Sequence, residues 1–173
     1  KEKSLSEFYL SGGTALAEYY LQHRDSDDLD FFCESPFSSI QVESFVDQVK
    51  QQLDSTSVRL VRIHDRRLFY LILPNQTELK LEFTQYPFHA LEKRNVIDGI
   101  RIDSLRDITA NKLAALIDRF EPKDFVDLYF LLQNRPLEEI RKDTEQKFGF
   151  TISPIFLGSE LAKVARIEAL PNM

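Results

Sequence analysis

Several features are scarce in this sequence, and each absence excludes a class of protein. Cys33 is the only cysteine among 173 residues, so the chain forms no internal disulfide and fits a reducing cytoplasm. No apolar run approaches the roughly 20 residues that a membrane-spanning helix needs, and residues 1–4 do not begin a signal peptide. The three histidines are too scattered to indicate a zinc site. We therefore expect a cytoplasmic protein without membrane contact. Because an initiator Met is missing, we also expect a piece of a longer chain.

Basic side chains are too few for a broad nucleic-acid-binding surface. The chain carries 22 Lys and Arg against 28 Asp and Glu, a net charge of −6. An acidic protein surface repels the phosphate backbone of a nucleic acid. Two local clusters remain open either as basic patches or as solvated surface side chains. They are Arg59, Arg62, Arg66 and Arg67, and then Lys93, Arg94 and Arg101. The other proportions, 43% hydrophobic and 29% charged, are typical of a soluble globular protein.

The order of the expected elements predicts an α+β protein in two parts. Strands are expected at 28–32, 58–63, 68–73 and 78–84, helices at 14–22 and 38–53, and a hairpin at 95–102. After Ser104 the pattern is helical, with helices expected at 104–119, from Pro122, from Pro136 to Gly149, and at 155–169. We therefore predict an α/β core over residues 1–103 and a helical C-terminal lobe, shortened at its end, over residues 104–173.

A pair of glycines follows the first short apolar segment. In Ser11-Gly12-Gly13-Thr14, the glycines permit positive φ and let a phosphate approach backbone N–H groups. The motif lacks the lysine of a Walker loop and does not match a dinucleotide fingerprint. Taken alone, it fits a structural turn equally.

Two carboxylates follow at alternate positions of a predicted strand. Side chains two residues apart share one face of a strand, so Asp28 and Asp30 converge while Leu29 and Phe31 turn into the core. Paired carboxylates repel each other unless a cation lies between them, and Mg²⁺ takes a few carboxylate oxygens and completes its shell with water and phosphate. This pattern favours a metal site over the alternative, a solvated acidic edge.

Other candidate residues lie farther along the chain. Glu82 is a third carboxylate on a neighbouring strand; the alternative is an exposed pair with Lys80. Lys112 is placed to reach a triphosphate, and Asp127 to anchor Lys112 or accept a proton. For Lys112 and Asp127, spacing alone favours surface salt bridges between two helices.

The segment between the glycines and the aspartates holds further candidates. Arg24, close to Ser26, is suited to pair with phosphate oxygens. Cys33 has no neighbouring base, so a buried structural role is expected for it.

Taken in order, these residues resemble the nucleotidyltransferases of the DNA polymerase β superfamily, and within it the AbiEii abortive-infection toxins. The resemblance covers roughly residues 8–133. It is carried by Gly12-Gly13-Thr14-Ala15-Leu16, by His23-Arg24-x-Ser26-x-Asp28-Leu29-Asp30-Phe31, by Lys80-x-Glu82-Phe83, by Asn111-Lys112-Leu113-x-Ala115-Leu116 with Arg119, and by Lys123-Asp124-Phe125-x-Asp127-Leu128.

The resemblance implies a mixed, mostly antiparallel sheet flanked by helices. It implies Asp28 and Asp30 as Mg²⁺ ligands, with Glu82 at a third position where relatives often carry Asp. It also implies Lys112 and Asp127 as further catalytic residues. The nucleotide-binding residues would be Ser11, Gly12, Gly13, Thr14, Arg24 and Ser26.

The sequence thus predicts a Mg²⁺-dependent transfer of a nucleoside monophosphate from a nucleoside triphosphate to RNA or tRNA. The resemblance implies that the enzyme is the toxin of a toxin–antitoxin pair and has a cognate antitoxin. Two alternatives stay open: a transferase with a small-molecule acceptor such as an antibiotic, which the acidic charge favours, and a non-catalytic nucleotide-binding module.

Overall fold

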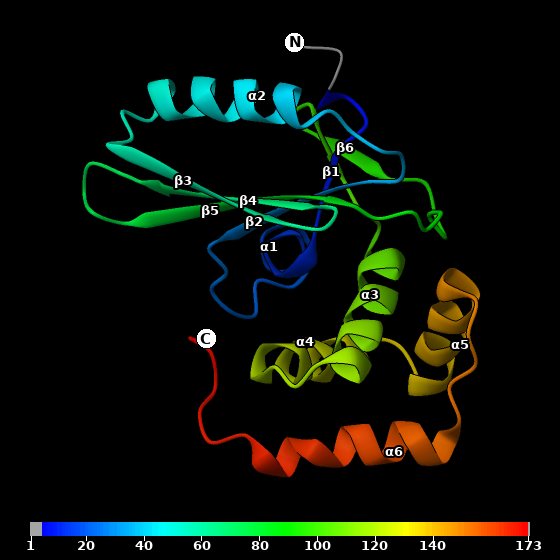
Figure 1. Cartoon of the computed structure of the whole chain (residues 1–173). Helices are drawn as coiled ribbons and strands as arrows, with labels where there is room; N and C mark the ends of the chain where they lie inside the picture. The colour runs from blue at the N-terminus through cyan, green and yellow to red at the C-terminus, as the bar shows by residue number, and fades with distance from the viewer. Residues whose placement is uncertain (1–4, 173) are drawn as a thin grey trace.

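The computed structural model describes residues 5–172, in which one mixed sheet has helices on both faces (Figure 1). The strands lie in the order β3-β4-β5-β2-β1-β7-β6. They are β1 (Tyr9–Ser11), β2 (Asp28–Cys33), β3 (Ser57–Ile63), β4 (Arg66–Ile72), β5 (Glu78–Gln85), β6 (Asn95–Ile97) and β7 (Ile100–Ile102). β2 pairs parallel with β5 and β1 parallel with β7, while the other neighbours are antiparallel. The predicted α+β class and the mostly antiparallel mixed sheet are confirmed.

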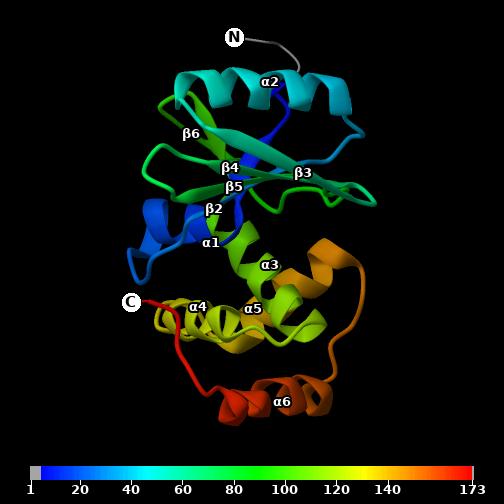
Figure 2. The ribbon, with the colours of Figure 1, turned by 60° about the vertical axis from the view of Figure 1, so that its left-hand side comes forward.

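The helices form two layers around this sheet, with α2 on one face and the other helices on the opposite side (Figure 2). They are α1 (Gly12–Leu16), which continues as a π-helical turn over Ala17–Leu21, α2 (Ser39–Gln52), α3 (Leu105–Asp118), α4 (Pro122–Leu132), α5 (Leu137–Phe148) and α6 (Pro154–Ala162), which ends in a 3₁₀ turn over Lys163–Arg166. None of the helices in residues 5–172 is long and apolar enough to cross a membrane.

Local sequence signals account for most of these boundaries. Ser104 caps α3 by accepting a hydrogen bond from the Asp107 backbone N–H, as its spacing predicts. Gly149 ends α5 with φ at 72°. Asp98 and Gly99 both adopt positive φ, which is the geometry that a tight hairpin requires.

Two of the expected helices have different bounds. The helix expected at 14–22 begins two residues earlier, at Gly12, and widens into the π-helical turn before Gln22 ends it in the left-handed region. The helix expected at 155–169 stops at Ala162, because the backbone tightens into the 3₁₀ turn and Ile167 is extended. Both differences lie at helix ends, where the sequence signal is weakest.

Side chains that alternate along the strands give the sheet one apolar face and one polar face. On β5, Leu81 and Phe83 are buried in a core shared with Val42 and Val46 of α2. On β2, Leu29 and Phe31 pack against the same core, as predicted. The residues between them, including Asp30, therefore face away from α2, toward the helices that follow the sheet.

A second core holds these later helices together. Leu113 and Leu116 of α3 pack with Phe125 of α4 and Ile140 of α5. An ion pair between Lys147 of α5 and Asp107 of α3, with 2.7 Å between Nζ and Oδ1, is fully buried. The helices thus form a fixed wall opposite the polar face of the sheet.

Candidate active site

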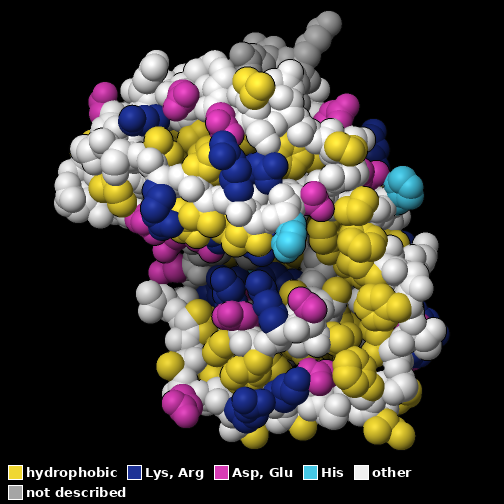
Figure 3. Space-filling view, viewed as in Figure 1, with side chains coloured by type: hydrophobic (Ala, Val, Ile, Leu, Met, Phe, Trp, Pro, Cys, Tyr) yellow, Lys and Arg dark blue, Asp and Glu magenta, His cyan; other side chains and the backbone are white. Residues whose placement is uncertain are grey.

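A cleft of about 750 Å³ separates the polar face of the sheet from α3, α4 and α5. Figure 3 shows this hollow, with Lys and Arg side chains gathered on its helical side. The predicted site residues that line it are Gly12, Gly13, Arg24, Ser26, Asp28, Asp30, Glu82 and Lys112. The chain therefore brings together, at one place, residues from α1 to α3.

The glycine turn follows β1 directly and lies against Asp30. Ser11 is the register partner of Asp30 across the β1–β2 pair. Gly12 has φ at 75°, and a Cβ there would lie 2.4 Å from Asp30 Oδ2. A Cβ on Gly13 would lie 2.5 Å from Arg24 Nη2. Gly12 therefore requires glycine, because its φ is positive and Asp30 occupies the space of a Cβ, whereas a Cβ on Gly13 would displace the Arg24 guanidinium.

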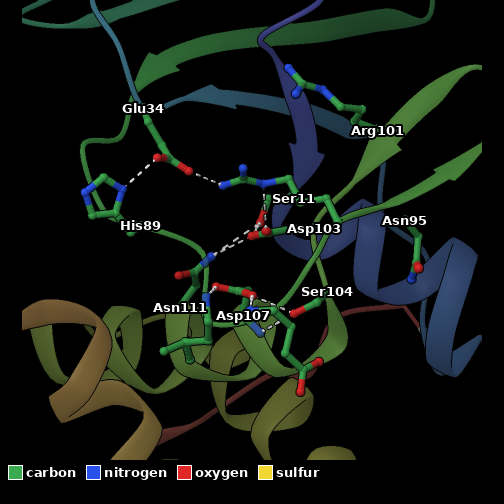
Figure 4. A network of polar contacts seen from close by, with 12 residues as sticks. Ser11, Glu34, His89, Asn95, Arg101, Asp103, Ser104, Asp107 and Asn111 are labelled. Atoms are coloured by element: carbon green, nitrogen blue, oxygen red, sulfur yellow. Dashed lines mark hydrogen bonds and ion pairs between the residues drawn. The ribbon is translucent and has the colours of Figure 1, made fainter.

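Ser11 and Thr14 lie beneath this turn and fix its shape. The buried Ser11 hydroxyl donates to Asp103 Oδ2 at 3.0 Å, and the Asn111 amide donates to the same oxygen at 3.3 Å (Figure 4). Burial raises the pKa of Asp103. The Thr14 hydroxyl contacts the backbone carbonyl of Asp28. Sequence reasoning assigned no role to Asp103, whose only local signal is its place just before the cap of α3.

Asp28 and Asp30 share the cleft face of β2, as their alternation predicts. Asp28 Oδ2 accepts from Lys80 Nζ at 2.9 Å. Within residues 5–172, the Asp30 carboxylate makes no hydrogen bond or ion pair, although its side chain is partly buried in the cleft. Burial, and then the charge of Glu82, raises the pKa of Asp30 to about 6. A partly buried carboxylate that lies close to Asp28 and Glu82 and has no ion pair of its own among residues 5–172 is a fit for a hard metal ion.

Glu82 lies opposite Asp30 in the β2–β5 register, but its carboxylate already has a partner. Arg66 donates to it through Nε at 2.6 Å and Nη2 at 2.8 Å. Burial alone would raise the pKa of Glu82, and these hydrogen bonds lower it. Among the described residues, no three acidic, His or Cys side chains cluster as a ligand set for a metal. The third ligand position of Glu82 stays a prediction.

Asp127 is the centre of a buried ionic cluster on the helical side. It accepts from His23 Nε2 at 2.7 Å, from Arg24 Nε at 2.6 Å, and from Lys112 Nζ at 2.5 Å. Burial opposes its ionisation, but the Arg24 hydrogen bonds and the Lys112 charge outweigh burial and hold the pKa of Asp127 at about 2. The prediction of surface salt bridges for Lys112 and Asp127 is therefore wrong, because both side chains are buried.

Asp124 extends this cluster toward the cleft. It accepts from Lys112 Nζ at 3.1 Å and from Arg119 Nε at 3.0 Å. Its side chain is fully buried, whereas that of Arg119 is half exposed. Lys112 is therefore held by two carboxylates and has a fixed position on the cleft wall. Sequence reasoning also missed His23, since nothing local to it reveals a partner 104 residues away.

Several other predicted residues have mainly structural contacts. The Arg24 guanidinium is buried and bonded to Asp127, although it also borders the cleft beside Gly13. The Ser26 hydroxyl is 2.9 Å from Thr14 Oγ1. Cys33 is buried, as expected, and burial raises its pKa to about 11.

The two basic clusters do not form continuous patches. Arg62 pairs with Glu43, and Arg66 with Glu82 in the cleft. Arg94 pairs with Glu34 and stacks over the ring of Tyr9.

Comparisons with known proteins agree with this arrangement. An uncharacterized protein of Aquifex aeolicus (strain VF5), aq_aa25, is 34% identical over 149 residues, which are 83% of this chain and 67% of that protein. The crystal structure of JHP933 from Helicobacter pylori superposes with a TM-score of 0.63 at 26% identity, over 98% of this chain and 77% of JHP933. MenT4, nucleotidyltransferase toxin Rv2826c from Mycobacterium tuberculosis H37Rv, shares the fold with a TM-score of 0.56 at 18% identity, over 94% of this chain and 65% of MenT4.

One family model covers most of the chain. It is described as nucleotidyl transferase AbiEii toxin, Type IV TA system, and it matches residues 2–152. The match includes the glycine turn, both aspartates of β2 and the buried cluster around Asp127. The family and fold predicted from the sequence are confirmed, and the chain belongs to the AbiEii nucleotidyltransferase toxin family.

Proposed function

We propose that this chain transfers a nucleoside monophosphate from a nucleoside triphosphate to a hydroxyl of RNA, with Mg²⁺ held by Asp28 and Asp30. Family membership gives the class of activity, a nucleotidyltransferase toxin that takes a triphosphate and is paired with an antitoxin. The observation that carries the metal assignment is the Asp30 carboxylate, which is partly buried, lies against Gly12, and makes no ion pair within residues 5–172.

The donor set around Asp30 suits a hard cation. Two carboxylates of β2 offer oxygen ligands, and the cleft leaves room for water and phosphate to complete the shell. When bound, Mg²⁺ would neutralise negative charge on the attacking and leaving oxygens. Asp28 is released for this role if its partner Lys80 turns to the incoming triphosphate.

Lys112 supplies positive charge on the opposite wall. In the reaction, the acceptor oxygen forms a bond to the α-phosphorus while the bond from that phosphorus to the bridging oxygen of pyrophosphate breaks. Lys112, fixed by Asp124 and Asp127, is suited to stabilise the charge that develops on the leaving pyrophosphate. In this proposal Asp127 positions Lys112 and Arg24. A fully buried aspartate whose pKa is about 2 is a poor acceptor for a proton.

The acceptor class rests on the local charge of the cleft rather than on the net charge. Arg66, Arg119 and Lys123 line the cleft. Arg66 and Arg119 are paired with Glu82 and Asp124, whereas Lys123 makes no ion pair within residues 5–172 and so remains for an acceptor phosphate. A reducing cytoplasm, which the single cysteine favours, supplies both triphosphates and RNA.

Transfer of α-labelled ATP, GTP, CTP and UTP to total tRNA in the presence of Mg²⁺ tests this function. We expect label on RNA with the unaltered protein and a loss of at least about 10²-fold with Asp30→Asn. Asp47→Asn, on the exposed side of α2, is the matched control and should be fully active. Full activity of Asp30→Asn would exclude the mechanism. Label on protein or on a small molecule, with RNA unlabelled, would exclude the acceptor but keep the chemistry.

A further inference from the structure

The floor of the cleft changes from charged to aromatic along β2 and β5. Asp28, Asp30 and Phe32 share one face of β2, because side chains alternate along a strand. In the parallel register, Asp30 lies opposite Glu82, and Phe32 lies opposite Thr84. Two residues of a strand span about 7 Å. The aromatic floor therefore begins about 7 Å beyond the carboxylates.

Beyond this point, aromatic side chains from three segments form one contiguous cluster, in which Tyr86 contacts both Phe88 and Phe148. The members of this aromatic wall, all lining the cleft, are Phe32 of β2, Tyr86 and Phe88 after β5, and Phe148 and Phe150 at the end of α5. Their successive ring centroids are 4.9, 4.9, 4.7 and 6.0 Å apart. Figure 3 shows hydrophobic side chains gathered to the right of the hollow.

The aromatic wall is more exposed than the attachment of α5 requires. Phe150 is 42% exposed, and none of the five rings is fully buried. α5 is already fastened to α3 by the buried pair of Lys147 with Asp107 and by the bidentate pair of Arg106 with Asp143. The rings therefore keep surface free for contact with a ligand in the cleft.

Cations line the same cleft as these rings. The Arg119 side chain is half exposed, and Lys123 makes no ion pair within residues 5–172. Aromatic faces for bases beside cations for phosphates are the combination that binds single-stranded nucleic acid without regard to sequence. A duplex would not expose its base faces to such a wall.

We propose that the aromatic wall stacks the last nucleobases of a single-stranded RNA acceptor and so directs its terminal ribose hydroxyl toward Asp30. This assignment rests on the proposed function and names the acceptor subsite of the same cleft. A cluster of five rings that ends at an exposed residue offers more stacking surface than the base of one triphosphate covers. A strand of several nucleotides fits this extent, and Arg119 and Lys123, which follow the other end of α3, line the same cleft for its phosphates.

Equilibrium binding of short RNAs tests this subsite independently of transfer. The probes are a labelled ten-nucleotide single strand and the same strand with abasic residues at its last two positions. We expect the unaltered protein to bind the complete strand about 5- to 100-fold more tightly. Phe88→Leu and Phe150→Ala should lose most of this preference, and Phe88→Tyr should restore it. Tyr129→Ala, which removes a 63% exposed ring outside the cleft, should keep it.

The same proteins are then assayed for transfer of label, with thermal unfolding as the check that each variant folds. Equal binding of complete and abasic strands by the unaltered protein would overturn the subsite, even if RNA is labelled. A base preference without any transfer would instead overturn the proposed function and leave the subsite standing. A raised KM for the triphosphate in the Phe variants, with RNA affinity unchanged, would assign the rings to the incoming base and refute the acceptor role.

Discussion

Two aspartates on opposite walls of the cleft show how environment decides the role of the same side chain. Asp30, on the sheet, is partly buried beside Glu82 and makes no ion pair within residues 5–172, and its pKa is raised to about 6. Asp127, on α4, is fully buried among His23, Arg24 and Lys112, and its pKa is lowered to about 2.

The difference between these aspartates separates a binding function from a structural one. Burial opposes ionisation at both positions, so the neighbouring charges account for the opposite signs. Asp127 is already neutralised by the protein and stabilises the junction of the sheet with the helices. Asp30 makes no ion pair within the described residues, which costs stability in the free protein, and in the proposed function a bound cation supplies the missing charge.

The largest effect on stability is expected from the removal of the Asp127 charge. Asp127→Asn leaves Arg24 and Lys112 buried with too little negative charge, so we expect the free energy of unfolding to fall by about 3–5 kcal/mol. Urea denaturation at pH 7 measures this loss. Asp47→Asn should change it by less than about 0.5 kcal/mol. A loss below 1 kcal/mol for Asp127→Asn would mean that the cluster is not a structural anchor.

Replacing Asp30 is expected to change the free energy of unfolding in the opposite direction, so that the variant is more stable. The raised pKa of Asp30 means that the folded protein becomes less stable as the pH rises from about 4 to about 6, where the unfolded chain releases this proton first. Asp30→Asn should therefore be more stable than the unaltered protein by about 3 kcal/mol at pH 8, and equally stable below pH 4. Adding Mg²⁺ at pH 8 should stabilise only the unaltered protein. Equal stability of the two proteins at pH 8 would contradict the unneutralised state of Asp30.

Acid should remove the contribution of the ionised Asp127 to the free energy of unfolding. Because its pKa is lowered, its stabilisation is present above the usual aspartate pKa near 4 and is lost as the pH falls toward 2. We expect a loss of about 2 kcal/mol over this window. Carboxyl carbon shifts in NMR should show Asp127 titrating near pH 2 and Asp30 near pH 6. A shared midpoint would remove the contrast between the two walls.

The smallest effect on stability is expected from a test of the contact between the glycine turn and Asp30. Gly12 and Gly149 have nearly equal positive φ, 75° and 72°, but only a Cβ at Gly12 would collide with another residue. Gly149→Ala should cost about 1–2 kcal/mol through backbone strain alone, and Gly12→Ala about 1 kcal/mol more. Gly12→Ala should also impair nucleotide transfer, whereas Gly149→Ala should not. Equal stability and activity of the two variants would show that Asp30 moves aside freely.

Short-range features of the fold were predictable from the sequence. The alternation of Asp28 and Asp30, the cap at Ser104 and the end of α5 at Gly149 all depend on residues within a few positions. The glycine turn was found for the same reason, although its tight fit against Asp30 was not visible. The order of these motifs sufficed to predict the family that the comparisons confirm.

The partners of the charged side chains were decided by the tertiary structure. Asp127 is hydrogen-bonded to His23, 104 residues away in the sequence, and Ser11 to Asp103, 92 residues away. Glu82 accepts hydrogen bonds from Arg66 of the neighbouring strand. Spacing predicted surface salt bridges between the two helices that carry Lys112 and Asp127, since it contains no information about what covers those helices. The sequence by itself determined which carboxylates exist and which share a face. Only the tertiary structure determined which carboxylates pair with basic side chains, because the charge around a buried group comes from residues that are distant in sequence.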